Sequence, residues 1–311
     1  MRNVLNPNER IDPVASRLWL EVKSRVQFNK AHPLRDEVTS RLLEHLHAMI
    51  LDPRDWLVWR PLSGGCMSMR ELSLKFPKSK SHFWQESPLA RKTVLEHQKP
   101  QSLLQWVQQF LALHRGPGAI PVQAFTPNSM DLIWSNLGMH NEHDPIEVIK
   151  IWANLLRPQG VAVFSCWGPD TLKELRSMYA NLGWPVPMHP LVDMHDWGDL
   201  LVQNGLSDPV MDMEYVSLTY DKVEVLLSDL RLLGRNLSPD RMGSLRSKTW
   251  ANDLHHALEQ ERVKAGGRLK LSFEIVYGHA FKAKPKALVA KEVQVSLNDM
   301  KLQLKNKPLR K

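Results

Sequence analysis

The stretch MDLIWSNLGMHNEHDPIEVIKIWANLLRPQGVAVFS, residues 130–165, decides the fold. Its two short apolar runs, 130–135 and 161–165, have the length and the aromatic or β-branched content of buried strands. Between them, Asp144 is followed by a proline and, three residues on, by a glutamate, which together signal the start of a helix over 146–156. A strand, a capped helix and a second buried strand are typical of a βαβ unit, so the chain is predicted to form a parallel sheet.

The alternation of helices and strands continues to residue 281. Capping boxes at 171–174 and 221–224 are expected to open two of the later helices. Helices are predicted over 171–183, 193–204, 221–234 and 249–265, and strands over 210–220 and 269–281. These two strands alternate apolar and polar residues at period two, so they are expected to pair at one edge of the sheet.

The first half of the chain carries weaker signals. Helices are predicted over 34–50, 67–76 and 101–114, and strands over 56–59, 81–84 and within 119–125. The chain is accordingly divided into three parts. A helical cap is expected over 1–50, an α/β domain over 51–284, and a basic, disordered tail over 285–311.

Cysteine usage and hydropathy exclude several classes of protein. The two cysteines, Cys66 and Cys166, are too few for a disulfide framework, and no CxxC or HExxH spacing indicates a metal site. The N-terminus lacks the apolar run of a secretory signal, and no apolar run is long enough to span a membrane. Free thiols fit a reducing compartment, so a cytoplasmic location is expected.

The net charge of +8 is concentrated at the C-terminus. Residues 281–311 hold nine Lys and Arg against one Glu and one Asp, a net charge of +7, which leaves about +1 for the first 280 residues. The folded part is therefore not expected to bind nucleic acid. The tail is either a solvated end or a segment that steers an acidic protein, a nucleic acid or a membrane surface.

Two loops that follow predicted strands could hold a ligand, because ligands bind beyond the carboxyl ends of parallel strands. The loop after strand 56–59 contains Gly64 and Gly65, which fit either a cofactor cradle or a plain tight turn. At the end of the second strand, Gln85 or Glu86 could accept hydrogen bonds from a ribose, and a solvated loop is the alternative.

The end of strand 130–135 offers a third set of polar residues. Ser135 and Asn136 would lie at the mouth of an otherwise apolar sheet. His140 could bind substrate or move a proton, since an imidazole titrates near neutral pH. The alternative is that His140 only bonds the adjacent loop. No catalytic dyad is visible, so no catalytic residue is assigned.

Several motifs in the second half resemble one family. The chain is similar to the biotin-synthesis methyltransferases that act on malonyl-acyl carrier protein, and to their relative, the mitochondrial complex I assembly arginine hydroxylase. The matching segments are 131–137, 156–161, 168–176, 196–201 with Asn204 and Gly205, 229–234 and 273–277. The resemblance implies a class I methyltransferase fold over 51–284. This is a doubly wound, Rossmann-like α/β fold with a mostly parallel seven-stranded sheet and an antiparallel edge strand.

The resemblance also implies S-adenosylmethionine as cofactor, but the loop departs from the family's Asp-Leu-Gly-Cys-Gly-Thr-Gly motif. If the motif ends at Gly65, Trp59 replaces its acid, while Pro61 and Ser63 replace its first two glycines. In the register shifted by one residue, Arg60 replaces the acid. The ribose-binding acid falls on Gln85, and the family's N-terminal tyrosine, a substrate-binding position, falls on Leu18 or Trp19.

Three functions follow from the resemblance. The first is methyl transfer from S-adenosylmethionine to the free carboxyl of malonyl-acyl carrier protein, which needs positioning but no general base. The second is a binding or assembly protein that has kept the fold and lost the cofactor, because a β-carbon and a proline obstruct the cradle. The third is an enzyme that modifies arginine on a protein substrate. The partner is an acyl carrier protein or another protein in each case.

Overall fold

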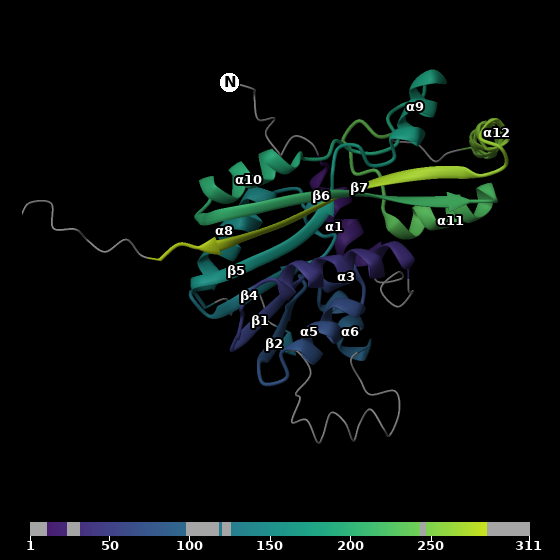
Figure 1. Cartoon of the computed structure of the whole chain (residues 1–311). Helices are drawn as coiled ribbons and strands as arrows, with labels where there is room; N and C mark the ends of the chain where they lie inside the picture. Colours follow the sequence, from purple (N-terminus) through teal and green to yellow (C-terminus); the bar gives the residue numbers. More distant parts are fainter. Residues whose placement is uncertain (1–10, 24–31, 98–117, 120–125, 243–246, 285–311) are drawn as a thin grey trace, which may run out of the picture.

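The computed structural model describes residues 11–23, 32–97, 118–119, 126–242 and 247–284. They form one seven-stranded sheet with the order β3-β2-β1-β4-β5-β7-β6, flanked by helices on both sides (Figure 1). Strand order reverses between β1 and β4, because the chain first builds the sheet outward from β1 to β3 and then returns to the other side of β1. The predicted doubly wound α/β class is confirmed.

Five neighbouring strands are parallel. They are β1 (Asp55–Trp59), β2 (Lys80–Trp84), β3 (Gly118–Ala119), β4 (Met130–Ser135) and β5 (Leu156–Trp167). The carboxyl ends of β1, β2 and β4 therefore meet at one edge of the sheet, where Trp59 pairs in register with Trp84. The predicted strand over 119–125 lies outside the described residues except at its first position.

The last two strands complete the sheet in antiparallel fashion. Strand β7 (Leu269–Lys282) runs antiparallel to β5 on one side and to β6 (Leu206–Tyr220) on the other. Strand β6 is the edge strand of the sheet, as the period-two pattern predicts.

Side chains from alternate strand positions build a separate core on each face of the sheet. Trp56 and Val58 of β1 belong to one core, and Leu57 and Trp59 to the other. The first core is covered by α3 (Pro33–His47), α5 (Met67–Lys75), α6 (Pro88–His97), α9 (Lys173–Asn181), α11 (Val223–Leu233) and α12 (Lys248–Lys264). The second is covered by α8 (Pro145–Leu155) and α10 (Met194–Gln203).

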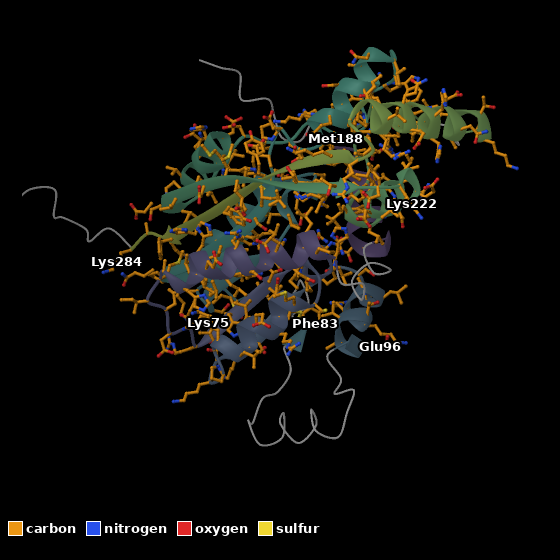
Figure 2. All side chains as sticks on the ribbon, turned by 45° about the vertical axis from the view of Figure 1, so that its right-hand side comes forward. Lys75, Phe83, Glu96, Met188, Lys222 and Lys284 are labelled. Carbon is orange, nitrogen blue, oxygen red and sulfur yellow. The ribbon has the colours of Figure 1, made fainter. Side chains whose placement is uncertain are left out.

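The side chains fill the space between the helices and the sheet, as Figure 2 shows. Phe83 on β2 is fully buried, whereas Glu96, Lys222 and Lys284 lie at the surface. No helix in the described ranges is both long and apolar enough to cross a membrane.

The capping boxes predicted for two helices, at 171–174 and 221–224, are wrong. Helix α9 begins only at Lys173, after Leu172 in the left-handed region, because the Thr171 hydroxyl bonds the main chain of Glu274 instead of capping the helix. Helix α11 has Lys222 at its N-cap position and no side-chain cap, while Asp221 pairs with Arg268. The box at Asp144 is confirmed, since its carboxylate accepts the N–H of Glu147. The predicted helix over 101–114 lies outside the described residues.

Candidate functional site at the switch point of the sheet

The loop after β1 turns sharply at the point where strand order reverses. Arg60 follows the strand with φ 51° and ψ 61°, the left-handed region that a residue with a β-carbon seldom adopts. The short helix α4 (Pro61–Gly64) comes next, and Gly65 continues with φ 81°. This turn aims the Arg60 side chain over the carboxyl ends of β1 and β4.

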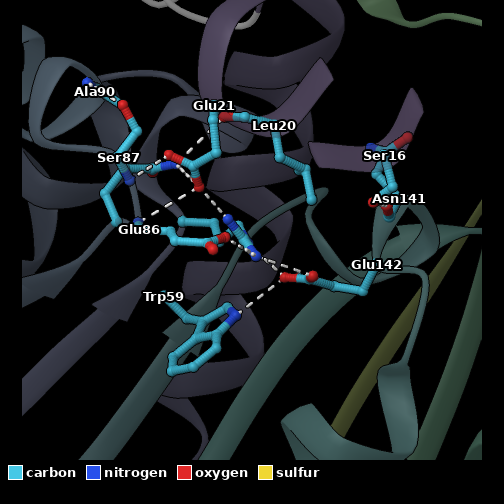
Figure 3. Close-up of polar contacts among 11 residues, drawn as sticks. Ser16, Leu20, Glu21, Trp59, Glu86, Ser87, Ala90, Asn141 and Glu142 are labelled. Atoms are coloured by element: carbon cyan, nitrogen blue, oxygen red, sulfur yellow. Dashed lines mark hydrogen bonds and ion pairs between the residues drawn. The ribbon is translucent and has the colours of Figure 1, made fainter. Parts of the chain in front are cut away.

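The Arg60 guanidinium is buried and bonds two carboxylates from distant parts of the chain, Glu21 and Glu142, which are labelled in Figure 3. Its Nε donates to Glu142 Oε1 at 2.5 Å and one terminal nitrogen donates to Glu142 Oε2 at 3.2 Å. The other terminal nitrogen donates to Glu21. Burial alone would lower the pKa of Arg60, but the charges of Glu142 and Glu21 outweigh burial and raise the pKa. The arginine therefore stays charged and binds two buried acids, while the exposed carboxylate of Glu86 lies 3.8 Å from one of its terminal nitrogens.

The Glu21 carboxylate lies at the carboxyl end of β2 (Figure 3). It accepts hydrogen bonds from Gln85 Nε2 at 2.9 Å, from the main-chain N–H of Glu86 at 3.3 Å and from that of Ser87 at 2.7 Å. Glu21 belongs to the π-helical turn η2 (Trp19–Lys23), which follows α1 (Pro13–Leu18). The N-terminal segment thus places an acid where the sequence predicts the ribose of a cofactor.

Two stacked tryptophans pack beneath Arg60. Trp59 and Trp84 stack with ring centroids 4.0 Å apart, and the Arg60 guanidinium lies 4.5 Å from the ring centroid of Trp84. Trp59 Nε1 donates to Glu142 Oε1 at 3.2 Å. Trp59, which stands at the acid position of the family motif in one register, is therefore a buried packing residue that helps to hold Glu142.

Gly64 has no free space in front of it. A β-carbon at this position would lie 2.6 Å from Cβ of Asn136. Asn136 is fixed in turn, because its Nδ2 donates to Thr39 at 2.8 Å and its Oδ1 accepts from the Ser165 hydroxyl at 2.6 Å. The glycine that should let a ligand approach the main chain instead lets the end of β4 approach it.

A small cavity adjoins this loop on the side of His140. Its volume is about 10 Å³, room for about one water. Its lining includes both predicted substrate residues, Trp19 and His140, together with the predicted cofactor residue Ser63. Trp19 is buried beneath the Arg235 guanidinium, which lies 5.4 Å from its ring centroid.

His140 is held as a neutral imidazole. Its Nδ1 accepts the main-chain N–H of Trp167 at 3.3 Å, and its ring stacks on that of Trp167 with centroids 4.6 Å apart. Burial and the neighbouring His189 hold the pKa of His140 well below its usual value. His189 Nδ1 accepts the N–H of Leu237, so its Nε2 donates to the His140 carbonyl, and burial lowers its pKa to about 4. His140 is thus bonded to Trp167 and Asn141 and is uncharged at neutral pH, and its role in binding substrate or moving a proton stays a prediction.

The residues around the loop do not fit S-adenosylmethionine. A ribose diol needs an acceptor at the end of β2, but Gln85 presents Nε2 there and Glu21 already accepts from it. A cradle needs an open glycine, but Gly64 packs on Asn136. A sulfonium is a cation, and Arg60 is a buried cation above β1. No group of three metal-binding side chains occurs within the described ranges either.

The structure brings most of the predicted site residues together at one edge of the sheet. Gln85 bonds Glu21, Glu86 contributes its N–H to the same acid, and Asn136 contacts Gly64. Ser135 is fully buried at the end of β4, and Ser63, Trp19 and His140 line the cavity. Their assignment to a cofactor or a substrate stays a prediction.

The sequence reasoning missed Glu21 and Glu142. They lie 39 and 82 residues from Arg60, so no local spacing joins them. The one available signal was Arg60 itself, because an arginine directly after a buried strand needs acidic partners once it is enclosed.

Comparisons with known proteins point to one family. No family model matches the chain. A malonyl-[acyl-carrier protein] O-methyltransferase of Gallionella capsiferriformans is 35% identical over 264 residues, which cover 83% of this chain and 87% of that protein. The protein of the same name from Laribacter hongkongensis is 29% identical, over 84% and 86% of the two chains. Malonyl-[acyl-carrier protein] O-methyltransferase 1 of Coxiella burnetii is 41% identical over 158 residues, about half of each chain.

Solved structures show weaker similarity. The YcgJ protein of Bacillus subtilis is 12% identical with a TM-score of 0.49, and the match covers 80% of this chain and all of that one. A putative methyltransferase of Bacillus halodurans is also 12% identical, with a TM-score of 0.47 over 79% of this chain and 99% of that one.

Proposed function

We propose that this chain, which belongs to the malonyl-[acyl-carrier protein] O-methyltransferase family, binds a carrier protein through the family fold. The names of the relatives support methyl transfer, but the geometry of the site leads us to propose that this chain does not transfer a methyl group from S-adenosylmethionine. The observation that carries this proposal is the buried Arg60, held by Glu21 and Glu142 over the carboxyl ends of β1 and β4. These three side chains occupy the switch point of the sheet, where an α/β fold of this kind binds its ligand.

Opening this site for a cofactor would be costly. Glu21 would have to leave four donors, and Arg60 would lose one of its two buried acidic partners. Removing one partner from a buried ion pair costs about 3–5 kcal/mol. Binding energy spent on such a rearrangement lowers affinity, and about 4 kcal/mol weakens a dissociation constant by roughly a thousandfold.

The carrier protein is proposed from the relatives and from charge. The relatives are named for methylation of a malonyl group on acyl carrier protein. Arg17 on α1 and Arg235 are exposed and have no carboxylate partner among the described residues. Arg235 lies beside Trp19, which lines the cavity. A surface with unpaired arginines favours an acidic partner. A cytoplasmic location is part of the proposal and agrees with the two free cysteines.

Growth of a bacterial strain that lacks its malonyl-acyl carrier protein O-methyltransferase tests the catalytic half. We expect that the chain, expressed as a soluble protein, does not restore growth without biotin. The Gallionella relative, which is 35% identical, is the matched positive control. Restored growth would contradict the proposal.

A titration with malonyl-acyl carrier protein tests the binding half. We expect saturable binding without S-adenosylmethionine, and weaker binding by the double variant Arg17→Glu and Arg235→Glu, because both substitutions place acids against an acidic surface. The exposed pair Lys264→Glu, at the end of α12, and Arg268→Glu, just before β7, is the control and should bind as the wild type does. Equal binding by both double variants would mean that the partner docks elsewhere.

A further inference from the structure

The donors around Glu21 form a set that recognises a carboxylate. Gln85 Nε2, the N–H groups of Glu86 and Ser87, and the Arg60 guanidinium all point at its two oxygens (Figure 3). Oε2 receives the shorter main-chain bond, from Ser87 at 2.7 Å, and Oε1 receives the bonds from Gln85, Glu86 and Arg60. We propose that these four donors are a carboxylate-binding site, which Glu21 of the same chain occupies as a built-in ligand.

The protein groups around Glu21 donate hydrogen bonds, whereas a ribose site needs protein groups that accept them. A ribose presents hydroxyl donors and calls for a protein acceptor. Here Gln85 is locked as a donor, because its Nε2 contacts both Glu21 Oε1 and the Leu20 carbonyl, at 2.9 and 3.2 Å. Its own Oε1 has no partner and is buried. A group that accepts hydrogen bonds, rather than one that donates them, therefore fits the site.

The donors remain in place without Glu21. Arg60 keeps Glu142 as a two-point partner, so its charge is still balanced and its position fixed. The N–H groups of Glu86 and Ser87 are held by the start of α6, where the Ser87 hydroxyl accepts the N–H of Ala90. The first turn of a helix also favours an anion. A vacated site is thus preorganised for a small carboxylate.

Glu21 holds the N-terminal segment by means of this site. The segment of α1 and η2 also makes other described polar contacts with the domain. Ser16 donates to the Asn141 carbonyl, Asp12 accepts from Arg241 and donates its N–H to the Leu237 carbonyl, and the Leu20 carbonyl accepts from Gln85. A tethered ligand acts at an effective concentration in the millimolar range, so free carboxylate at lower concentration does not displace it. The wild type should therefore be indifferent to added carboxylate, and only loss of Glu21 should expose the site.

Chemical rescue of Glu21→Ala tests this inference. The melting temperature of the full-length variant is measured with sodium formate or acetate, against sodium chloride at equal ionic strength. We expect the variant to melt about 5 °C below the wild type. Formate should restore at least half of this loss in a saturable way, with a midpoint at about 1–10 mM. If Glu21→Ala is soluble only when formate or acetate is present during expression, that result would also support the carboxylate site.

Glu21→Gln is the matched control, since its amide fills the site without offering a carboxylate. It should melt below the wild type and respond to formate no more than to chloride. If Glu21→Ala responds equally to formate and chloride, the carboxylate site does not exist. The inference is independent of the proposed function. Methyl transfer by the wild type would overturn the proposed function, but rescue of Glu21→Ala by formate would still show a carboxylate site.

Discussion

At the scale of single residues, position 85 decides which groups meet at the end of β2, because a glutamine stands there where the family resemblance implies an acid. With a glutamine there, Glu21 can approach to 2.9 Å and accept a hydrogen bond. With a glutamate, two carboxylates would meet in a buried position, and one of them would have to bind a proton. The amide and the acid of this pair are therefore matched to each other.

The substitution Gln85→Glu should destabilise the protein at neutral pH. Contact between like charges costs several kcal/mol, so we expect a loss of about 3 kcal/mol in the free energy of unfolding. The loss should shrink toward pH 5, as one of the two acids takes up a proton. Urea unfolding measures it. The double variant Glu21→Gln with Gln85→Glu restores a matched pair and should recover most of the stability; an additive loss would show that the two side chains do not interact.

His189 gives the protein a defined response to acid. Burial lowers its pKa to about 4, whereas an unfolded histidine titrates near 6.5, so the unfolded chain binds more protons between these values. Stability is therefore complete above about pH 7 and decreases as the pH falls toward 4, by about 3 kcal/mol from this residue.

Unfolding in urea at pH 7 and at pH 5 measures this response. In His189→Gln the amide can replace both hydrogen bonds without titrating, so the decrease between the two pH values should be smaller. The exposed His195→Gln is the control and should behave as the wild type. An unchanged decrease in His189→Gln would mean that other groups carry the acid response.

At the scale of elements, the conformation of the loop after β1 follows from its packing against neighbouring elements and not from a need to leave room for a ligand. Gly64 packs on Asn136 of the β4 end, whose side chain is fixed by Thr39 and Ser165. Arg60 links the same loop to η2 through Glu21 and to the segment after β4 through Glu142. Three elements thus depend on one turn.

The substitution Gly64→Ala should lower stability by about 1–3 kcal/mol, because a new methyl group 2.6 Å from Asn136 Cβ overpacks the contact. The control is Gly198→Ala in α10, where a β-carbon would lie at an ordinary 3.6 Å from Met211 and a helix gains from alanine. Thermal melting compares the two. Tolerance of Gly64→Ala would show that the loop can move away from β4.

The substitution Arg60→Met leaves Glu21 and Glu142 buried without their common cation. The expected loss is about 3–5 kcal/mol in urea unfolding. Arg41→Met, which removes an exposed arginine paired with Glu37 on α3, should change stability little. Comparable losses in both variants would contradict the view that the Arg60 network holds the loop together.

At the scale of the whole molecule, the fold was predictable and the closed site was not. Most strands and helices follow from local signals, as the Asp144 cap and the alternation in β6 show, and their bounds differ by a few residues. Helix α6 is not among the predicted elements. The two wrong capping boxes fail because Thr171 and Asp221 find partners, Glu274 and Arg268, that are distant in sequence.

The predicted site residues do gather at one edge, because parallel strands end together. What fills that edge depends on Glu21 and Glu142, which reach Arg60 over 39 and 82 residues of chain. Pairing at that separation is decided by tertiary packing, and no spacing in a single sequence reveals it.

Isothermal titration of the full-length chain with S-adenosylmethionine tests the central claim most directly, with the Gallionella relative as positive control. We predict no saturable heat up to about 1 mM ligand, because Arg60 and Glu21 occupy the ends of β1 and β2, where the sequence predicts the cofactor. Saturable binding at about 10 µM or below would contradict it.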